Sequence, residues 1–267
     1  MKLCVIGNSH AGMLAAAFRD TPLPGAEVTF FARQGKALDQ VRLRAGELRM
    51  PNRDARKAMI KMGMPGRIRV DAFDAFVIVG MTATAFALAP MVAGHAVYGW
   101  PSAMAEIEAT GQTARPLMSE PALEAALRAA IEGNTACAMI AKIRKHSRAP
   151  ILLVPQPYPS EDVLARKDGF LGFRLIHRRG DGVAAAAALE AAHTRAFAPV
   201  DALHILRQPS ETIAHGFLTA SDFTRGATRL NVTGKQPEAD ILHANAAYGR
   251  LVAGQIEAML EGFSVNT

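Results

Sequence analysis

The stretch Leu3-Cys4-Val5-Ile6-Gly7-Asn8-Ser9-His10 joins a short apolar run to a polar turn. A run of four apolar residues that ends at a glycine is typical of a buried strand. Four later runs, rich in β-branched, aliphatic or aromatic residues, also end in turn-forming residues and predict four more strands: Val28–Phe31, Phe76–Val79, Ile151–Val154 and Leu203–Leu206.

Segments with helical periodicity separate these strands. The predicted helices cover Gly12–Arg19, Arg53–Lys61, Ala122–Arg144, Val183–Arg195 and Ala246–Glu261. Alternation of strands and helices predicts a parallel sheet with helices on both faces. The chain has 267 residues, of which 50% are hydrophobic and 20% charged, and no linker-like segment divides it. We therefore predict an α/β fold with one domain over residues 1–267.

The polar turn after the first strand and a short motif near the end of the chain together offer the groups of a nucleophilic site. In parallel sheets, ligands bind beyond the carboxyl ends of the strands, and Ser9 follows the first predicted strand. Asp240-Ile241-Leu242-His243 precedes the last predicted helix. A serine nucleophile needs an imidazole to take its proton, and that imidazole needs an acceptor on its other nitrogen. Ser9, His243 and Asp240 supply these three groups.

These motifs resemble the SGNH (GDSL-type) hydrolase superfamily over nearly the whole chain. The resemblance implies a three-layer α/β/α flavodoxin-like fold with a five-stranded parallel sheet. It also implies a serine esterase with Ser9 as nucleophile, His243 as base and Asp240 as orienting carboxylate, and with no cofactor and no metal. The substrate would be a small-molecule ester, such as an acyl group on a carbohydrate.

The same resemblance assigns the oxyanion hole. It places one donor at the backbone of Ser9 and one at Gly35, which follows the second strand. The third block of the family is usually G-x-N-D, but this chain reads Gly80-Met81-Thr82-Ala83 there, without the asparagine. Thr82 is the candidate replacement, since its hydroxyl is able to donate a hydrogen bond. Asn8 and His10 also depart from the family pattern.

Three alternatives remain at this stage. An acyltransferase would use the same three residues with a different acceptor, and the absent third-block asparagine leaves room for a binding protein with little catalytic activity. A dinucleotide site is the third, because Gly7-x-Ser9-x-x-Gly12 differs by one residue from the phosphate-binding glycine motif. Against it, the second strand ends at Arg33 without an acidic residue for the ribose.

The net charge of +6 is concentrated in one segment. Arg42–Arg69 contains nine basic residues against Glu47 and Asp54, a net of +7. This segment is either a solvated surface or a positive rim that attracts an anionic substrate. It has no aromatic residue for stacking on bases, so a nucleic-acid partner is not expected.

Two features bear on membranes and compartment. Ala75–Gly94 is mostly apolar and about as long as a membrane span, but Gly80 and Pro90 interrupt it. We expect a buried strand followed by a loop or short helix, and no stable membrane insertion. The apolar stretch at the N-terminus is shorter than the roughly 7–15 residues of a signal-peptide core, so a cytoplasmic location is expected.

Some residues near the candidate site have supporting or undecided roles. Asn245, Tyr248 and Gly249 follow His243 and are expected to support the structure, with Asn245 bonding to nearby backbone groups. Pro155-Gln156-Pro157-Tyr158-Pro159 is expected to be a stiff connector, because proline removes backbone donors. Substrate contact through Tyr158 or His10 is the less favoured alternative.

Overall fold

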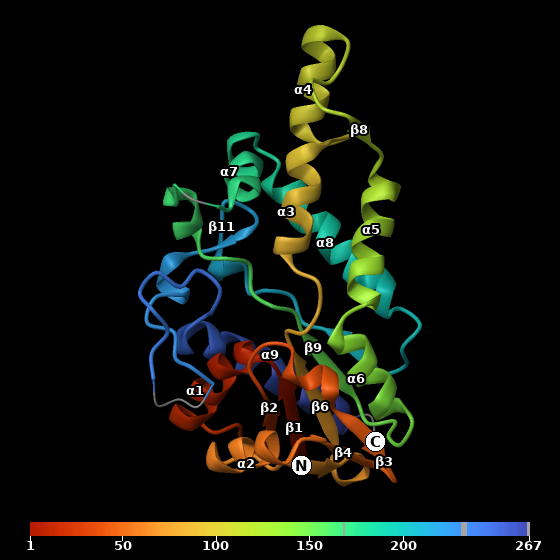
Figure 1. The fold of residues 1–267 in the computed structure, drawn as a ribbon, viewed down its shortest axis with the longest axis vertical. Helices are drawn as coiled ribbons and strands as arrows, with labels where there is room; N and C mark the ends of the chain where they lie inside the picture. The colour runs from red at the N-terminus through yellow and green to blue at the C-terminus, as the bar shows by residue number, and fades with distance from the viewer. Residues whose placement is uncertain (168, 231–233, 266–267) are drawn as a thin grey trace.

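The computed structural model describes residues 1–167, 169–230 and 234–265. Its central feature is a parallel five-stranded sheet with the order β10-β9-β6-β1-β2 (Figure 1). The strands are β1 (Lys2–Gly7), β2 (Glu27–Ala32), β6 (Ala75–Val79), β9 (Ile151–Val154) and β10 (Leu203–Ile205). Each predicted strand is therefore confirmed. If these five strands are numbered 1 to 5 in the order in which they occur along the chain, their order across the sheet is 2-1-3-4-5, as in flavodoxin-like folds.

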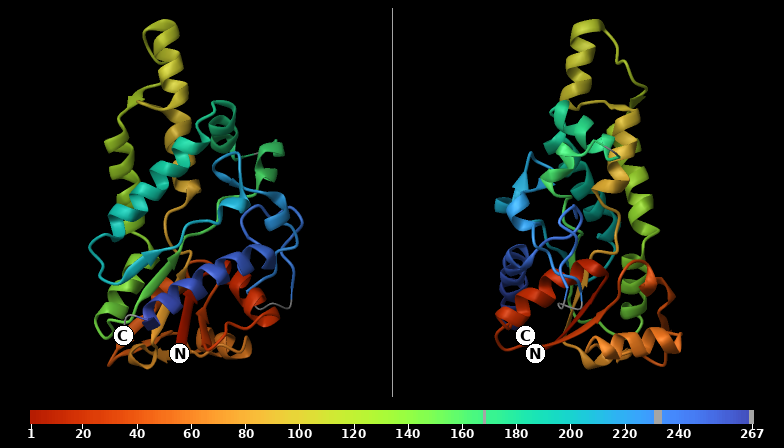
Figure 2. Two further views of the ribbon diagram at one scale, coloured as in Figure 1. Left: turned by 180° about the vertical axis from the view of Figure 1, so that it is seen from behind. Right: turned by 60° about the vertical axis from the view of Figure 1, so that its left-hand side comes forward.

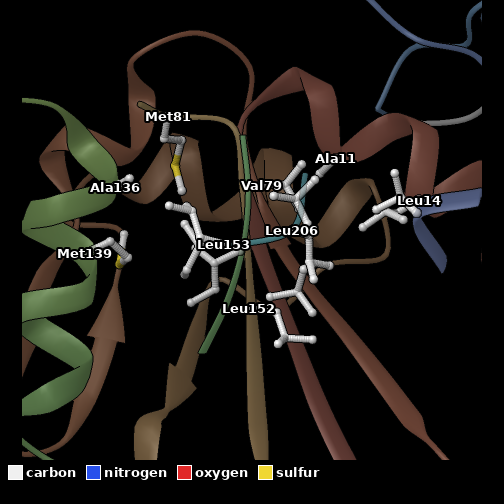
Figure 3. Close-up of a cluster of buried hydrophobic side chains, with 14 of the residues drawn as sticks. Ala11, Leu14, Val79, Met81, Ala136, Met139, Leu152, Leu153 and Leu206 are labelled. Carbon is white, nitrogen blue, oxygen red and sulfur yellow. The ribbon is translucent and has the colours of Figure 1, made fainter. Parts of the chain in front are cut away.

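Helices cover both faces of this sheet, as predicted. On one face lies α1 (Gly12–Asp20), which packs on α9 (Ala246–Val265), and on the other lies α6 (Thr135–Arg144). Figure 3 shows Leu14 of α1 on one side of the strands and Met139 of α6 on the other. Every residue of β6 is buried, as a strand enclosed on both faces requires.

The predicted helix over Ala122–Arg144 is wrong as a single element. The chain forms α5 (Glu120–Glu132) and α6 instead, with a break at Gly133 and Asn134. Gly133 ends α5, and its backbone N–H bonds to the carbonyl of Ala129. A tertiary contact stabilises the restart, since the N–H of Ala136 donates to Met81 O over 2.9 Å. Helix α2 (Arg53–Lys61) matches its prediction, and α8 (Gly182–Phe197) extends slightly beyond its own.

A helical extension projects beyond the carboxyl ends of the sheet strands (Figures 1 and 2). It consists of α3 (Ala85–Gly94), α4 (Pro101–Thr110), α5, α7 (Leu171–Arg178) and α8. The segment Ala75–Gly94 thus forms β6 and then α3, which starts at a Thr84 cap and contains Pro90. No helix in the described part of the chain combines the length and apolarity needed to cross a membrane.

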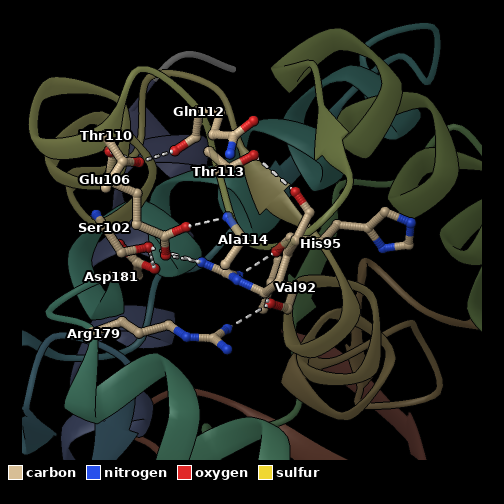
Figure 4. Close-up of polar contacts among 11 residues, drawn as sticks. Val92, His95, Ser102, Glu106, Thr110, Gln112, Thr113, Ala114, Arg179 and Asp181 are labelled. Atoms are coloured by element: carbon tan, nitrogen blue, oxygen red, sulfur yellow. Dashed lines mark hydrogen bonds and ion pairs between the residues drawn. The ribbon is translucent and has the colours of Figure 1, made fainter.

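A polar cluster fixes α4 to the rest of the extension (Figure 4). The carboxylate of the buried Asp181 accepts from the N–H of Ser102 over 3.0 Å and from its hydroxyl over 2.6 Å. Arg115 and Arg179 both donate to the carbonyl of Val92, over 3.2 and 3.0 Å. Hydrogen bonds to charged groups of this kind are stronger than neutral ones, and here they join α3 and α4 to the turn between α7 and α8.

Smaller elements complete the fold. The antiparallel strands β3 (Arg42–Arg44), β4 (Glu47–Arg49) and β5 (Arg67–Arg69) form a three-stranded sheet. Figure 1 shows β3, β4 and α2 at the end of the molecule where the strands of the main sheet begin. The basic segment thus lies at the edge opposite the carboxyl ends of those strands.

The remaining elements are β7 (Ala96–Val97), β8 (Leu117–Met118), β11 (Ile213–Ala214), β12 (Leu218–Thr219) and the 3-10 turns η2 (Ala37–Gln40), η3 (Val70–Ala72), η4 (Glu161–Ala165), η5 (Ser210–Thr212) and η6 (Ser221–Phe223).

Candidate active site

Ser9 lies at the carboxyl end of β1, between the ends of β6 and β2. Gly7 closes the strand, and a Cβ there would lie 2.9 Å from Val79 O, so the close approach of the two strands requires glycine. The chain then forms the 3-10 turn η1 (Ser9–Ala11), capped by the side-chain oxygen of Asn8, which accepts from the N–H of His10 over 3.1 Å. This is the point where the strand order reverses, which is where such sheets bind ligands.

Asp240 and His243 lie on the loop that leads into α9. The carboxylate of Asp240 accepts from the backbone N–H of Leu242 over 3.1 Å and of His243 over 3.2 Å. A further backbone bond of 2.9 Å, from the N–H of Ser160 to Ile241 O, joins this loop to the segment after β9. The turn is thus held by the chain around it as well as by its own bonds.

The structure brings Ser9, His243 and Asp240 together across 234 positions of sequence. Nε2 of His243 lies 2.9 Å from Oγ of Ser9, and Nδ1 lies 2.8 Å from Oδ2 of Asp240. A carboxylate only accepts, so Nδ1 carries the proton and Nε2 of the neutral ring accepts from the serine hydroxyl. This tautomer is the one in which the imidazole is able to remove the proton of Ser9.

The electrostatic environment keeps Asp240 charged. Its side chain is only 12% exposed, and burial by itself would raise the pKa of its carboxyl. The hydrogen bond and charge of His243, together with the two backbone N–H groups, outweigh burial and hold the pKa of Asp240 below its ordinary value. Asp240 is therefore an acceptor throughout the neutral pH range.

His10 makes a contact that the sequence did not indicate. Its ring is stacked on that of His243, with centroids 4.8 Å apart and planes inclined by 23°. Burial, and next the neighbouring charge of His243, lower the pKa of His10 from 6.5 to about 3, against opposing effects of Asp240 and Gln156. A neutral ring therefore packs against the ring of His243 and adds no competing charge.

The residues after His243 support the site as predicted. Asn245 caps α9 by accepting from the N–H groups of Ala247 and Tyr248, and its amide donates to two backbone carbonyls. A Cβ at Gly249 would lie 2.2 Å from Met13 O, so glycine allows α9 to approach α1. Since η1 leads directly into α1, this contact sets the distance between Ser9 and His243.

A cavity of about 390 Å³ adjoins the turn after β1, and Ser9, His243 and Asp240 are not part of its lining. Gly35, Thr82 and Asn8 all line it, together with Lys36 and Lys142 among others. Gly35 has a φ of +61°, a left-handed conformation that favours glycine. Gly80 makes room for Asn8, because a Cβ on Gly80 would lie 2.7 Å from the side-chain oxygen of Asn8.

Thr82 is buried, and its hydroxyl has a partner. Its Oγ1 lies 3.2 Å from Nε2 of His193, whose Nδ1 lies 2.9 Å from the carbonyl of Leu189. Burial lowers the pKa of His193, which favours the neutral ring. Nδ1 then donates to the carbonyl, and Nε2 accepts the hydroxyl proton of Thr82. An oxyanion contact from Thr82 would require this hydrogen bond to break.

Comparison with solved structures finds chains with a similar arrangement of elements. One is the lipase Lip_vut3 from goat rumen metagenome, with a TM-score of 0.44, 10% identity, and coverage of 97% of this chain and 96% of that one. Another is the acetyl xylan esterase AlAXEase, with a TM-score of 0.34, 12% identity, and coverage of 97% and 99%. No protein-family model matches the sequence, and no curated protein matches it.

Proposed function

We propose that this protein is an SGNH-type serine esterase that hydrolyses an ester-linked acyl group through Ser9, His243 and Asp240. The main support for the proposal is that His243 forms two hydrogen bonds, one of 2.9 Å to Oγ of Ser9 and one of 2.8 Å to the carboxylate of Asp240. The three residues stand at the carboxyl end of the sheet, in the geometry that activates a serine.

In the proposed mechanism, Oγ of Ser9 attacks the ester carbonyl carbon while Nε2 of His243 takes its proton. The tetrahedral intermediate collapses, the bond to the alcohol oxygen breaks, and the imidazolium gives its proton to that leaving group. A water then attacks the acyl-serine, His243 removes its proton, and the acid leaves as Ser9 regains a proton. Asp240 accepts from Nδ1 of His243 throughout and stabilises the imidazolium.

The oxyanion needs donors that point at the carbonyl oxygen as charge develops there. The backbone amides of Ser9 and Gly35 are the first two in this proposal. Asn8 and Thr82 are the two candidates for the third donor, and Asn8 is the stronger of them. The side-chain oxygen of Asn8 accepts from the N–H of His10, so the Nδ2 group of Asn8 takes no part in that bond. Asn8 also lines the same cavity as Gly35. The hydroxyl of Thr82 is already bonded to His193.

We infer that the substrate extends from Ser9 into this cavity, because Asn8, which precedes Ser9 in the chain, lines it. Its lining contains the polar side chains of Asp39 and Asn134 together with Lys36 and Lys142. A polyhydroxy alcohol with a small acyl group, such as an acylated carbohydrate, suits a polar site of this size, and the two lysines would favour one that carries negative charge.

Labelling with a fluorophosphonate tests the proposal, because the reagent forms a covalent bond only with an activated serine. We expect one label per chain, found by peptide mass spectrometry on Ser9, and none in Ser9→Ala. Ser210→Ala is the matched control, since Ser210 is an exposed serine remote in sequence from all three residues. A folded wild-type protein that fails to react at Ser9 would overturn the proposal.

A further inference from the structure

A second and larger cavity lies beside the sheet, away from Ser9. Its volume is about 490 Å³, and it is bounded by α8, α9, β10 and the segments that follow β6 and β9. Figure 2 shows α8 and α9 flanking the β9–β10 edge of the sheet. None of Ser9, His243 and Asp240 lines it. Its size is within the usual range for small-molecule sites, roughly 300–1,000 Å³.

About half of the residues that line the cavity are aliphatic, and polar side chains such as Gln156, His204 and Gln255 line much of the rest. The apolar side chains that line it come from both helices and from β10 and its flanks: Leu189, Phe197, Val200, Leu203, Leu206, Val252 and Met259. Only one of these is aromatic. Met259 is unbranched and flexible, and such side chains adapt to ligands of variable shape. The aliphatic part of the wall suits a flexible hydrocarbon chain, and the polar part suits an oxygen-bearing end group.

Two tyrosines are among the polar residues that line this cavity. Tyr158 is 8% exposed and Tyr248 is 2% exposed, and both line the cavity. Among the described residues, neither hydroxyl has a hydrogen-bond partner, although the backbone groups of both tyrosines are bonded. Neither hydroxyl is among the fully buried polar atoms of the described residues that lack a partner, so both oxygens are open to the cavity and able to donate to a ligand.

Both hydroxyls are donors at every physiological pH. Burial raises the pKa of Tyr158 and the pKa of Tyr248 above the ordinary value for tyrosine. The charges of neighbouring side chains have a smaller effect on both pKa values. At the rim, Arg207 forms an ion pair with Glu190 over 3.4 Å. The arginine therefore has its own counter-ion, and the two tyrosine hydroxyls are available as donors to a ligand oxygen.

We propose that this cavity binds a fatty acyl chain, with the chain against the aliphatic wall and a carbonyl or carboxylate oxygen accepting from Tyr158 and Tyr248. The ligand is a free fatty acid or a long-chain acyl ester, and the site is distinct from Ser9. It does adjoin the triad, because Gln156 lines the cavity and also interacts with His10, which stacks on His243.

The test is calorimetric titration of the full chain carrying Ser9→Ala, so that no ester is consumed and the result is independent of the esterase proposal. The probes are dodecanoic acid and methyl dodecanoate, each below its solubility limit. We expect one molecule bound per chain. Binding of the acid alone identifies a free fatty acid as the ligand, and binding of the methyl ester as well identifies an acyl ester.

Variants then place the ligand. Replacing both Tyr158 and Tyr248 by Phe keeps the shape and removes both donors, so we expect the Kd to rise roughly tenfold or more. Tyr98→Phe is the matched control, because Tyr98 is 55% exposed and lies outside the cavity. Val200→Trp fills the space and should abolish binding, with Thr194→Trp at the lining as the replacement if the first variant does not fold.

Three results would overturn the proposal. One is the absence of saturable binding of both probes, and another is binding that survives filling of the cavity. The third is an unchanged Kd in the Phe double variant, which would remove the tyrosines from the site. Failure of fluorophosphonate labelling at Ser9 affects only the esterase proposal, because binding here is measured without that serine.

Discussion

The ring of His10 lies against the ring of His243, with their centroids 4.8 Å apart, while His243 is bonded to Ser9 on one nitrogen and to Asp240 on the other. The imidazole of His243 is therefore restrained at one face and at both nitrogens. An imidazole fixed in this way has little freedom to leave the position from which it reaches Ser9.

Burial of His10 predicts a pH-dependent stability. The pKa of His10 is lowered from 6.5 to about 3 in the folded protein, so the unfolded chain binds its proton first as pH falls. The free energy of unfolding should therefore decrease from about pH 6.5 downward. His10→Phe keeps a stacked ring without the titration, so its Tm should fall less between pH 7 and pH 4.5, as measured by circular dichroism. Parallel curves for the two proteins would show that His10 does not contribute.

Ser9→Ala should reduce kcat on p-nitrophenyl acetate by a factor of at least ~10³, because the remaining groups cannot replace the nucleophile. The fold should be retained, since the side chain of Ser9 is bonded to His243 alone among the described residues. Steady-state kinetics and a Tm close to that of the wild type check the two parts. Retention of most of the activity in the purified variant would remove Ser9 from the mechanism.

Asn8 and Thr82 are distinguished by a pair of variants. Asn8→Asp keeps the side-chain acceptor for the N–H of His10 but removes the Nδ2 donor, so kcat should fall by about tenfold or more with KM little changed. Thr82→Val removes a hydroxyl that is bonded to His193. It should cost about 1 kcal/mol of stability and change kcat by less than about threefold. The opposite pattern would assign the third oxyanion donor to Thr82.

Gly249→Ala should separate α9 from α1, because its Cβ would lie 2.2 Å from Met13 O. Overpacking of this kind costs about 1–3 kcal/mol, and the displaced Ser9 should lose activity as well. The matched control is Gly254→Ala on the same helix, where a Cβ meets nothing within 4 Å. That change should stabilise the protein by about 0.5–1 kcal/mol. Equal Tm values for the two variants in thermal melts would contradict the packing argument.

Local patterns in the sequence were sufficient for the five strands, and they also singled out Ser9, His243 and Asp240, which the structure brings within hydrogen-bond distance of one another. A strand that is buried on both faces is apolar at nearly every position. A continuous apolar run such as Phe76–Val79 therefore identifies a buried strand without knowledge of its partners. Ser9 and His243 could be paired because both motifs stand at chain positions, after the first strand and before the last helix, that a parallel sheet brings to one edge.

Other features were decided by contacts between residues far apart in the chain. The break between α5 and α6 is stabilised by the bond from Ala136 to Met81, and the hydroxyl of Thr82 is bonded to His193, which is 111 positions away. The stacking of His10 on His243 and the cavity shared by Tyr158 and Tyr248 depend in the same way on how the strand-end loops meet α9. Periodicity and composition describe what a segment buries, whereas the partner that it is buried against is fixed only when the elements pack together.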